Sequence, residues 1–358
     1  MDYRHSHPDH HSRALTRLLH SLPKIDLHRH LEGSLRLSTM AAIAGDCGLE
    51  LPGAQVEQFR HLVQVVPEDR RHADVFMSKF GTLREFYRSP EAIERVAYEA
   101  VADAAADNVV YLELLFTPAA LARKMGFALE DVTAWVIGAV ERAQADFDID
   151  VRLLVTINRH ESVELGEQQV EIAIANRERG VVGVNLAGAE NHYRGAPFAD
   201  VFRRARAAGL HTAIHAGEWA GAESIAEALD VLGAERLGHG VRVLESARLV
   251  TEARARGITF EVCPTSNVQS GVAPSYEAHP LGAMVRAGLR TTINTDDPSV
   301  SGIDLTDEYA HAVEEMGLSL ADLKQCLLNA AHAAFLPDAE RAALVARLTA
   351  ALGDLPLA

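Results

Sequence analysis

The chain has 358 residues, of which 48% are hydrophobic and 23% are charged, an ordinary composition for a globular protein. The formal net charge of −16 argues against a nucleic-acid binder, because phosphate contacts need clustered Lys and Arg. No apolar run approaches the length that a membrane-spanning helix needs, so we expect no membrane contact.

The first twelve residues are polar and rich in His, and we expect residues 1–12 to form a disordered tail. Residues 13–358 are expected to form one domain, because no linker interrupts them. Within it, eight β-rich runs alternate with helical stretches, at Lys24–His28, Val109–Phe116, Val151–Ile157, Val181–Leu186, His211–His215, Arg236–His239, Ile258–Cys263 and Arg290–Asn294. This alternation predicts a parallel sheet, and eight units favour a closed (β/α)8 TIM barrel over an open α/β sheet.

The segment between the first two predicted strands is too long for a simple connection. It contains helical patterns at Leu37–Cys47, Asp69–Leu83 and Ser89–Asp107. We interpret it as a helical insertion after strand one that forms a lid or wall over the barrel mouth. Extra helices are expected after the last strand.

The three cysteines, Cys47, Cys263 and Cys326, are far apart and form no CxxC pair. Their odd number and spacing favour a reducing compartment over a disulfide framework. The N-terminal region also lacks the apolar stretch of a signal peptide, so a cytoplasmic location is expected. No oligomeric state follows from these features.

Polar residues follow the predicted strands where a barrel enzyme builds its active site, at the carboxyl ends. His28 and His30 are two apart, so both imidazoles face the same side of a strand. With a third nitrogen from His215 and an oxygen from Asp296, they form a set that zinc accepts while keeping room for water. Zinc lowers the pKa of its bound water from 15.7 to about 7.

Each of these residues also has a structural alternative. The pair His5 and His7 shows the same HxH pattern in the expected tail, so the pattern alone is weak. His215 could be a core histidine, and Asp296 could cap a turn or helix before Pro298. His239 lies between two glycines, which indicates that the backbone closely approaches another group.

Six stretches occur in an order that resembles the adenosine deaminase family of the amidohydrolase superfamily. They are LPKIDLHRHLEGSLR (22–36), VVGVNLAGAE (181–190), HAGE (215–218), GHG (238–240), EVCPTSN (261–267) and NTDDP (294–298). The resemblance implies one Zn²⁺ per chain, with the ligands His28, His30, His215 and Asp296.

The resemblance also implies the remaining roles. Glu218 is similar to the carboxyl group that gives a proton to purine N1, and His239 to the residue that orients or deprotonates the water. Asp296 would help to hold the nucleophile on one face of the ring. The implied substrate contacts are His30, Glu32 at the ribose 5′-hydroxyl, Asp297 at N7 and the backbone of Gly188 at N3.

The implied reaction is hydrolytic deamination of adenosine and 2′-deoxyadenosine to inosine and ammonia, a step of purine salvage. Zinc-bound hydroxide would attack C6 while Glu218 protonates the ring, so we expect burial and nearby negative charge to raise the pKa of Glu218. The expected partner is a small purine nucleoside.

Three residues depart from the family's usual pattern, GxDLAGDE. Asn185 and Ala189 replace its two Asp residues, and Glu32 stands where the adenosine enzymes usually have Asp. These departures affect the sugar side of the site, so the same chemistry on aminodeoxyfutalosine or on free adenine remains an alternative. A non-catalytic barrel is disfavoured because every ligand and Glu218 are present. The cytidine-deaminase fold is disfavoured because the chain lacks PCxxC. A single zinc is favoured because no lysine lies in the strand at 181–186 to bridge two metals.

Overall fold

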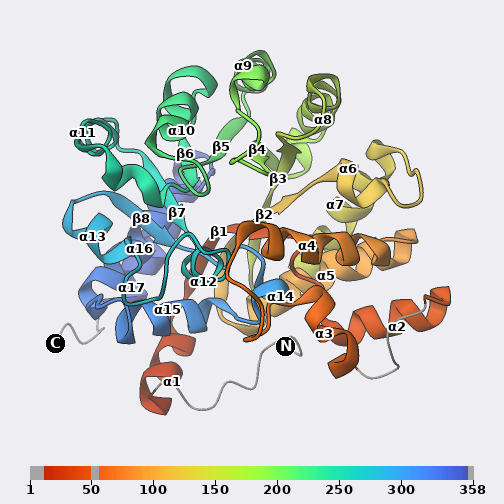
Figure 1. Cartoon of the computed structure of the whole chain (residues 1–358), viewed down its shortest axis with the longest axis horizontal. Coiled ribbons are helices and arrows are strands. Elements are labelled where there is room, and N and C mark those ends of the chain that lie inside the picture. Colours follow the sequence, from red (N-terminus) through yellow and green to blue (C-terminus); the bar gives the residue numbers. More distant parts are fainter. Residues whose placement is uncertain (1–11, 50–55, 354–358) are drawn as a thin grey trace.

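The computed structural model describes residues 12–49 and 56–353, so residues 1–11 of the expected tail lie outside the described part. Within these ranges, eight parallel strands form one sheet in sequence order, surrounded by helices (Figure 1). The strands are β1 (Lys24–His30), β2 (Val109–Phe116), β3 (Asp150–Asn158), β4 (Val181–Ala187), β5 (His211–Ala216), β6 (Arg236–His239), β7 (Thr259–Val262) and β8 (Arg290–Ile293). The predicted strands and TIM-barrel fold are confirmed.

Helices connect the strands and also precede and follow the barrel. Those before β4 are α1 (Arg13–Ser21), α2 (Leu37–Cys47), α3 (Val56–Val63), α4 (Ala73–Leu83), η1 (Arg84–Phe86), α5 (Pro90–Ala106), α6 (Pro118–Ala122), α7 (Leu129–Asp146), α8 (Val163–Ala175) and η2 (Arg177–Arg179). Those after β4 are η3 (Ala196–Phe198), α9 (Ala199–Ala207), α10 (Ala222–Glu227), η4 (Ala228–Leu232), η5 (Val241–Glu245), α11 (Ala247–Arg256), α12 (Pro264–Gln269), α13 (Leu281–Arg286), α14 (Pro298–Ser301), α15 (Leu305–Glu314), α16 (Leu320–Ala333) and α17 (Asp338–Ala351). In the described parts of the chain, no helix combines the length and apolar character required to cross a membrane.

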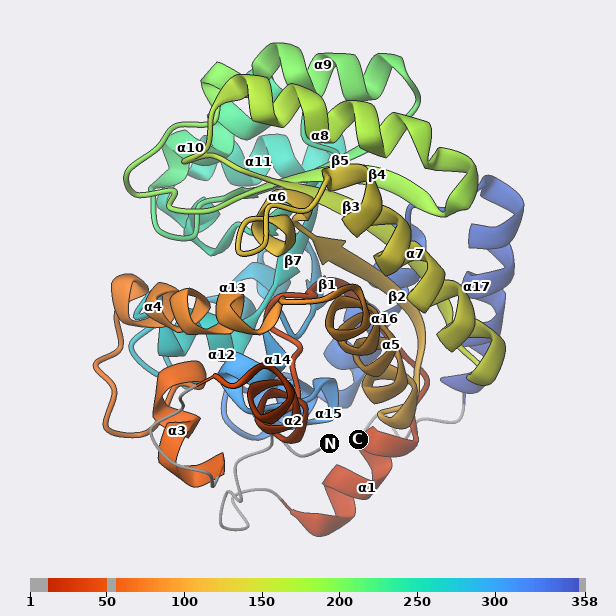
Figure 2. The ribbon, with the colours of Figure 1, turned by 90° about the vertical axis from the view of Figure 1, so that its right-hand side faces the viewer.

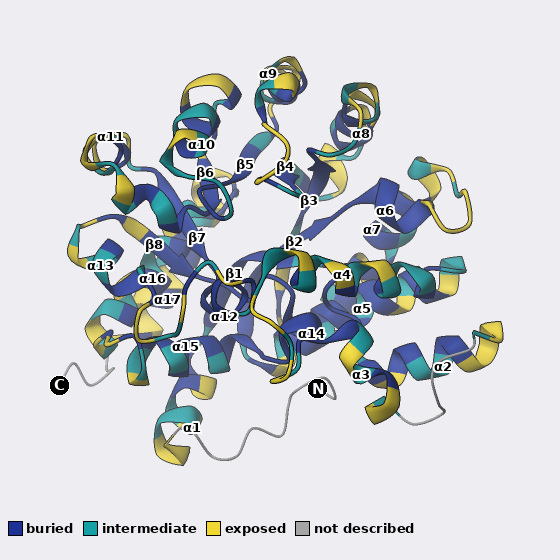
Figure 3. Ribbon diagram, in the orientation of Figure 1, coloured by how far each residue is buried: buried dark blue, intermediate teal, exposed yellow. Residues whose placement is uncertain are grey.

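The strands are buried on both faces, and this explains their nearly continuous apolar sequences. Every residue of β2, VVYLELLF, is buried, because one face lies inside the barrel and the other under α5. Exposed residues gather on the outward faces of the surrounding helices (Figure 3). The barrel is therefore a packed core, and its strand ends are the places left for polar groups.

The barrel closes where the chain beyond β8 meets β1. The amide N–H of Asp296 donates to the carbonyl of His28 (2.8 Å), and the N–H of His30 donates to the carbonyl of Asp296 (2.7 Å). Deeper in the seam, the Asn294 side chain replaces a main-chain partner and accepts from the Leu27 N–H (3.0 Å). Closure thus places three of the predicted ligands side by side.

The predicted insertion forms a wall of the active-site end, but it is shorter than the sequence suggested. Helix α5 packs on β2 and against α7, where the barrel's own first helix belongs, so the insertion comprises residues 37–86. Two hydrogen bonds just after α3 attach the insertion to α14. The Val65 N–H donates to the Val300 carbonyl (2.8 Å), and the Gln64 amide donates to the Ser299 carbonyl (2.6 Å). Figure 2 shows α3 and α4 beside α12 and α14.

Phe335, which follows α16, contributes to the interior of the barrel. It packs with Leu115 and Leu154 from β2 and β3, and its ring stacks on His211 at 4.3 Å between centroids. The Arg236 guanidinium lies 3.5 Å from the ring centroid. The predicted C-terminal helices therefore help to complete the barrel's packing.

We expect Phe335→Ala to lower the free energy of unfolding by about 3–5 kcal/mol, because it leaves a cavity in a packed interior. Phe335→Leu retains most of the apolar volume but loses the ring face under Arg236, and should cost about 1–2 kcal/mol. Urea denaturation of both variants measures the difference. Equal stability of Phe335→Ala and the parent chain would contradict this account of the packing.

Candidate metal centre and active site

Three barrel strands bring the predicted ligand set together. His28 and His30 lie on β1, His215 lies on β5, and Asp296 follows β8. The Nε2 atom of His215 lies 3.1 Å from that of His28 and 3.3 Å from that of His30. The Oδ1 atom of Asp296 lies 3.4 Å from both of these Nε2 atoms. The four ligand atoms therefore point at one common centre.

The spacing of these atoms fits zinc. With bonds of about 2.0–2.1 Å, a tetrahedral ion separates its ligands by roughly 3.3–3.4 Å. The observed separations of 3.1–3.4 Å match these edges. Three nitrogens and one carboxylate oxygen are also donors that zinc prefers. The residues present thus fit the metal that the sequence predicted.

The charges of the cluster also favour a cation. Burial opposes the charged form of His28, but hydrogen bonds to Asp296 and Glu261 outweigh it and raise the pKa of His28 to about 10. Burial lowers the pKa of His30 to about 4 and that of His215 well below its ordinary value. In the metal-free protein, a proton on His28 therefore provides the positive charge that a metal would otherwise supply.

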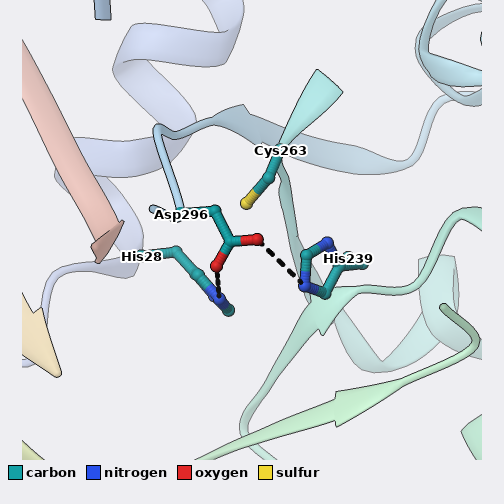
Figure 4. A group of neighbouring side chains, drawn as sticks. All are labelled: His28, His239, Cys263 and Asp296. Carbon is teal, nitrogen blue, oxygen red and sulfur yellow. Dashed lines mark ion pairs between the residues drawn. The ribbon is translucent and has the colours of Figure 1, made fainter. Parts of the chain in front are cut away.

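A second group of possible ligands overlaps the first. It comprises His28, His239, Cys263 and Asp296, with the Asp296 carboxylate between the two imidazoles (Figure 4). Burial raises the pKa of the Cys263 thiol well above its usual value, and the thiol donates to the Glu261 carbonyl (3.5 Å). Because the thiolate is the metal-binding form, this group is the weaker candidate. It also shares two ligands with the first group.

His239 is held in an unusual backbone conformation at the end of β6. Its φ of 57° lies in the left-handed region, as does the φ of 60° at Asp296. Such conformations are uncommon for residues other than glycine and gather at functional sites. The neighbouring Gly238 lies against the ligands, since a Cβ there would be 2.8 Å from His28 Cε1 and 3.1 Å from His215 Nδ1. The glycine therefore allows the close approach that the sequence indicated.

A chain of hydrogen bonds determines which His239 nitrogen carries the proton. Nδ1 of His279 accepts from the Leu281 N–H (3.1 Å), so the neutral His279 ring has its proton on Nε2 and donates to Asn267 Oδ1 (3.2 Å). The Asn267 amide then donates to His239 Nδ1 (3.1 Å). Burial lowers the pKa of His239 to about 3, so the ring is neutral and its proton lies on Nε2. This N–H points toward the ligand cluster, 3.9 Å from Asp296 Oδ2.

Glu218 is buried beside the cluster, and its Oε2 lies 3.6 Å from His239 Nε2. Burial raises its pKa well above the usual range, and the negative charges of Asp296 and Glu190 add to the rise. The expected direction and both expected causes are thus found. The carboxyl group is therefore protonated near neutral pH and can donate.

The Glu190 carboxylate positions the loop that carries Glu218. It accepts from four successive backbone N–H groups, those of Gly217 (2.7 Å), Glu218 (3.0 Å), Trp219 (2.7 Å) and Ala220 (3.0 Å). These bonds satisfy donors that burial would otherwise leave without partners. The loop is therefore held rigidly without a regular helix or strand.

Asp297 lies next to the ligand Asp296 and is also buried. Burial raises its pKa well above the usual value, and the negative charge of the neighbouring Asp296 raises it further. Its Oδ1 has no hydrogen-bond partner among the residues that the structure describes. A Cβ at Gly33 would fall 1.9 Å from this atom, so only glycine leaves space for the Asp297 side chain.

A cavity joins these groups, with an empty volume of about 640 Å³ that includes the part open to solvent. Among its lining are Gly188 and Glu32, so the structure brings every predicted substrate-binding residue to one pocket. Glu32 accepts from the Thr117 N–H (2.6 Å) through Oε1, while its buried Oε2 has no protein partner. The lining residues are His30, Glu32, Phe76, Met77, Phe80, Arg84, Thr117, Ala120, Thr156, Asn158, Ala187, Gly188, His215, Glu218, Trp219, His239, Asp296 and Asp297.

Buried polar atoms without partners line this cavity at several points. They include Thr156 Oγ1, Trp219 Nε1 and the free oxygens of Glu32 and Asp297. Since buried polar atoms are rarely left unpaired, these mark places for a ligand or water to bind. Asn185 on β4 is also buried without a partner, but it does not line the cavity.

Several residues of the site did not emerge from the sequence. Glu190 and Glu261 lie inside recognised motifs, yet their contacts depend on folding. Glu261 connects His28 (2.7 Å) to the buried Arg236, whose Nε lies 2.6 Å from the other carboxylate oxygen. Asn267 ends a recognised motif, whereas nothing in the sequence distinguishes His279 from an ordinary histidine. Only the folded structure reveals that these residues fix the ligands and His239.

The barrel, the ligand set and the protonated carboxyl group define a metal-dependent hydrolase of the amidohydrolase type that acts on a C–N bond. Comparison with known proteins gives the particular family. The adenosine deaminase profile matches residues 23–351, and the chain belongs to this family. Adenosine deaminases from Shewanella loihica and Klebsiella pneumoniae are each 37% identical, over 91% and 92% of this chain and 98% of theirs.

Solved structures of related proteins share the fold. An adenine deaminase from Arthrobacter aurescens superposes with a TM-score of 0.86 and 28% identity, covering 93% of this chain and all of its own. An amidohydrolase from Burkholderia ambifaria with bound Zn gives 0.85 and 29%, over 96% and 94% of the two chains. Arabidopsis ADAL in complex with IMP gives 0.84 and 27%, over 94% and 99%.

Zinc binding should release about one proton per chain at neutral pH. His28 is protonated in the metal-free protein because its pKa is raised to about 10, and it must lose this proton to bind a metal. Zinc affinity should therefore rise as the pH increases toward that value. Calorimetric titration of the metal-free protein in buffers of different ionisation enthalpy measures the released protons. A heat independent of the buffer would show that His28 is already neutral.

Proposed function

We propose that the protein catalyses hydrolytic deamination of adenosine and 2′-deoxyadenosine to inosine and ammonia, using one Zn²⁺ per chain. The observation that carries this proposal is the protonated Glu218 carboxyl group beside an N3O set of possible metal ligands in one cavity. Two adenosine deaminases at 37% identity over nearly the whole chain support the choice of substrate.

His28, His30, His215 and Asp296 would hold the metal. When bound, zinc would lower the pKa of a water molecule to about 7 and so make hydroxide available at neutral pH. His239 would act on the attacking oxygen. Because its Nδ1 accepts from Asn267, its Nε2–H is a donor, and the ring orients the attacking oxygen. Of the two roles that the family resemblance offers for His239, orientation is the one that this tautomer supports.

Glu218 is the proton donor to the purine. Addition of oxygen at C6 breaks the ring's aromaticity, and negative charge would develop at N1 unless a proton arrives. The neutral carboxyl group of Glu218 supplies that proton, for which its raised pKa is suited. The resulting carboxylate can accept the proton of the hydroxyl group added at C6 and pass it to the amino group, so that the C6 carbonyl forms as ammonia leaves.

The other ring nitrogens of the purine determine which groups the pocket wall must offer. N7 and N3 only accept hydrogen bonds, so their partners must be donors. Asp297 meets this requirement because its raised pKa keeps the carboxyl group protonated, with one oxygen free of protein partners. Gly188, at φ 93° beyond β4, would offer its backbone N–H to N3. Beyond these groups the cavity continues past Glu32 to the insertion, which leaves space for a sugar and favours a nucleoside over free adenine.

We further propose that the protein acts in the cytoplasm in purine salvage, on a small-molecule nucleoside. Its three cysteines, Cys47, Cys263 and Cys326, are all unpaired, which fits a reducing compartment. The net charge of −16 supports the absence of a nucleic-acid partner.

The test of the proposed function is a direct assay with purified, zinc-loaded protein. Loss of the adenine absorbance should follow mixing with adenosine or 2′-deoxyadenosine, and inosine or its deoxy counterpart should appear in stoichiometric amount. Adenine and aminodeoxyfutalosine are measured alongside. Turnover of free adenine alone, with no turnover of the nucleosides, would assign the chemistry to a different substrate and refute the proposal.

Glu218→Gln should retain zinc and lose about 10²–10⁴-fold in kcat, because the amide cannot supply the proton to N1. In the parent enzyme, activity should fall at high pH as the Glu218 carboxyl group ionises, and the residual activity of the variant should lack this dependence. Glu223→Gln is the matched control, since Glu223 lies nearby on α10 but does not line the cavity. Near-normal kcat with bound zinc in Glu218→Gln would exclude the residue as the donor.

A further inference from the structure

A second, more open pocket continues from the catalytic cavity on the side away from the metal. We call it the distal pocket. It shares Met77, Arg84 and Trp219 with the catalytic cavity and contains none of the four predicted ligands. Its lining residues are Ala73, Asp74, Met77, Arg84, His160, Ala189, Asn191, Tyr193 and Trp219. A substrate that fills the catalytic cavity can therefore extend into the distal pocket.

Arg84 lies at the junction of the two pockets, at the start of η1. It is half-buried, and no hydrogen bond or ion pair joins its guanidinium to any residue in the described parts of the chain. Among the described residues that line the catalytic cavity, it is the one Arg or Lys side chain. The charge of Arg84 acts on the Glu32 carboxyl group of the same cavity without an ion pair between them, so the guanidinium is suited to bind an anionic oxygen group on a ligand.

The distal pocket also lacks an acid that the family's usual pattern places in its lining. Ala189 stands at the position of the second Asp in GxDLAGDE, and it lines the distal pocket together with Arg84. An Asp at this position would offer a carboxylate to the guanidinium or repel an anionic ligand. Its replacement by Ala leaves the positive charge of Arg84 available.

The remaining charges around the distal pocket leave Arg84 dominant. Asp74 lines the distal pocket, but its side chain is 73% exposed and lies 3.5 Å from His72, so solvent screens its charge. Burial is the main cause of the lowered pKa of His160, and the nearby Arg84 adds to it, so this ring is neutral. Glu161 is paired with Arg123.

The proposed purine orientation directs the sugar toward this pocket. With C6 at the metal, N1 at Glu218 and N7 at Asp297, the N9 side of the ring points away from the ligand cluster. The ribose then lies near Glu32, whose buried Oε2 is available for a sugar hydroxyl. Substituents on the 5′ carbon are the part of a nucleoside that extends beyond the ribose, toward Arg84.

We propose that Arg84 and the distal pocket select adenine nucleosides that carry an anionic group on the 5′ side of the sugar. This inference rests on the proposed deamination and specifies the substrate class of the same site. The shared chemistry is an oxyanion, either a phosphate or a carboxylate. A related structure of the same fold, ADAL, was solved with the 5′-nucleotide IMP, so the fold is compatible with such a group.

The test compares three substrates with the zinc-loaded enzyme. They are adenosine, adenosine 5′-monophosphate and adenosine 5′-carboxylate, the last two carrying the phosphate and the carboxylate. In the parent enzyme, kcat/KM for at least one anionic nucleoside should equal or exceed that for adenosine. The larger of the two anionic values identifies which oxyanion the pocket prefers.

Variants of the distal pocket then test whether its residues cause the preference for anionic nucleosides. The readout is the ratio of kcat/KM for the better anionic nucleoside to that for adenosine, so a general loss of activity cancels. Arg84→Met should lower this ratio roughly 10- to 100-fold, and Arg84→Lys should lower it less. Ala189→Asp should lower it by adding a carboxylate to the same pocket, which keeps the test valid if Arg84→Met fails to fold. Arg88→Met is the matched control, because Arg88 is paired with Glu85 outside both pockets and should leave the ratio unchanged.

The outcomes separate the two proposals. If adenosine is deaminated but both anionic nucleosides are at least 100-fold poorer, or if the ratio is unchanged in Arg84→Met and Ala189→Asp, the inference is overturned and the proposed function stands. If none of the three compounds is deaminated by zinc-loaded protein, the proposed function itself fails. A lowered ratio in both variants, with the Arg88→Met control unchanged, establishes the distal pocket as the specificity site.

Discussion

The active site depends on how the barrel closes. The backbone of Asp296 bonds to His28 and His30 at the seam between β1 and the chain after β8, and the side chains of the same three residues converge on the metal centre. A shift in register at this seam would turn the side chains of β1 to the other face and scatter the ligands. The same hydrogen bonds therefore complete the fold and assemble the site.

The low dielectric of the closed barrel gives the site its protonation states. Burial holds Glu218 and Asp297 in their neutral forms, which makes two carboxyl groups into hydrogen-bond donors. It also keeps His239 neutral, and the Asn267 amide places that proton on the nitrogen facing the ligands. A purine ring presents acceptors at N1, N3 and N7, so a pocket of donors is complementary to it.

The insertion after β1 supplies part of the wall of the substrate cavity, whereas the barrel strands carry the predicted metal ligands. The metal ligands come from strand ends, whereas Phe76, Met77, Phe80 and Arg84 of the cavity wall come from α4 and η1. Loops and insertions tolerate change better than strand ends because they carry less of the core. This division of roles explains how departures at Ala189 and Glu32 can coexist with an intact ligand set.

Much of the architecture and the reacting groups could be predicted from the sequence. Nearly continuous apolar runs indicate buried strands, and the amphipathic stretches between them indicate helices. For this reason all eight strands could be predicted from the sequence. The spacing of His28 and His30 alone implies a shared face of one strand. The predicted insertion was too long because a helical pattern does not reveal which partner a helix packs against. Helix α5 belongs to the barrel only because it lies on β2 and α7.

The sequence by itself therefore determined the fold class and the family motifs, and it predicted the residues proposed for metal binding and proton donation. Tertiary structure alone decided the spacing of the predicted ligands and the tautomer of His239. It also decided that Glu190 accepts from four backbone N–H groups and that, among the described residues, Arg84 has no ion-pair partner. These features depend on distances between residues that are remote in sequence. The pKa of Glu218 follows the same rule, because burial and the charge of Asp296 act only after the barrel has closed.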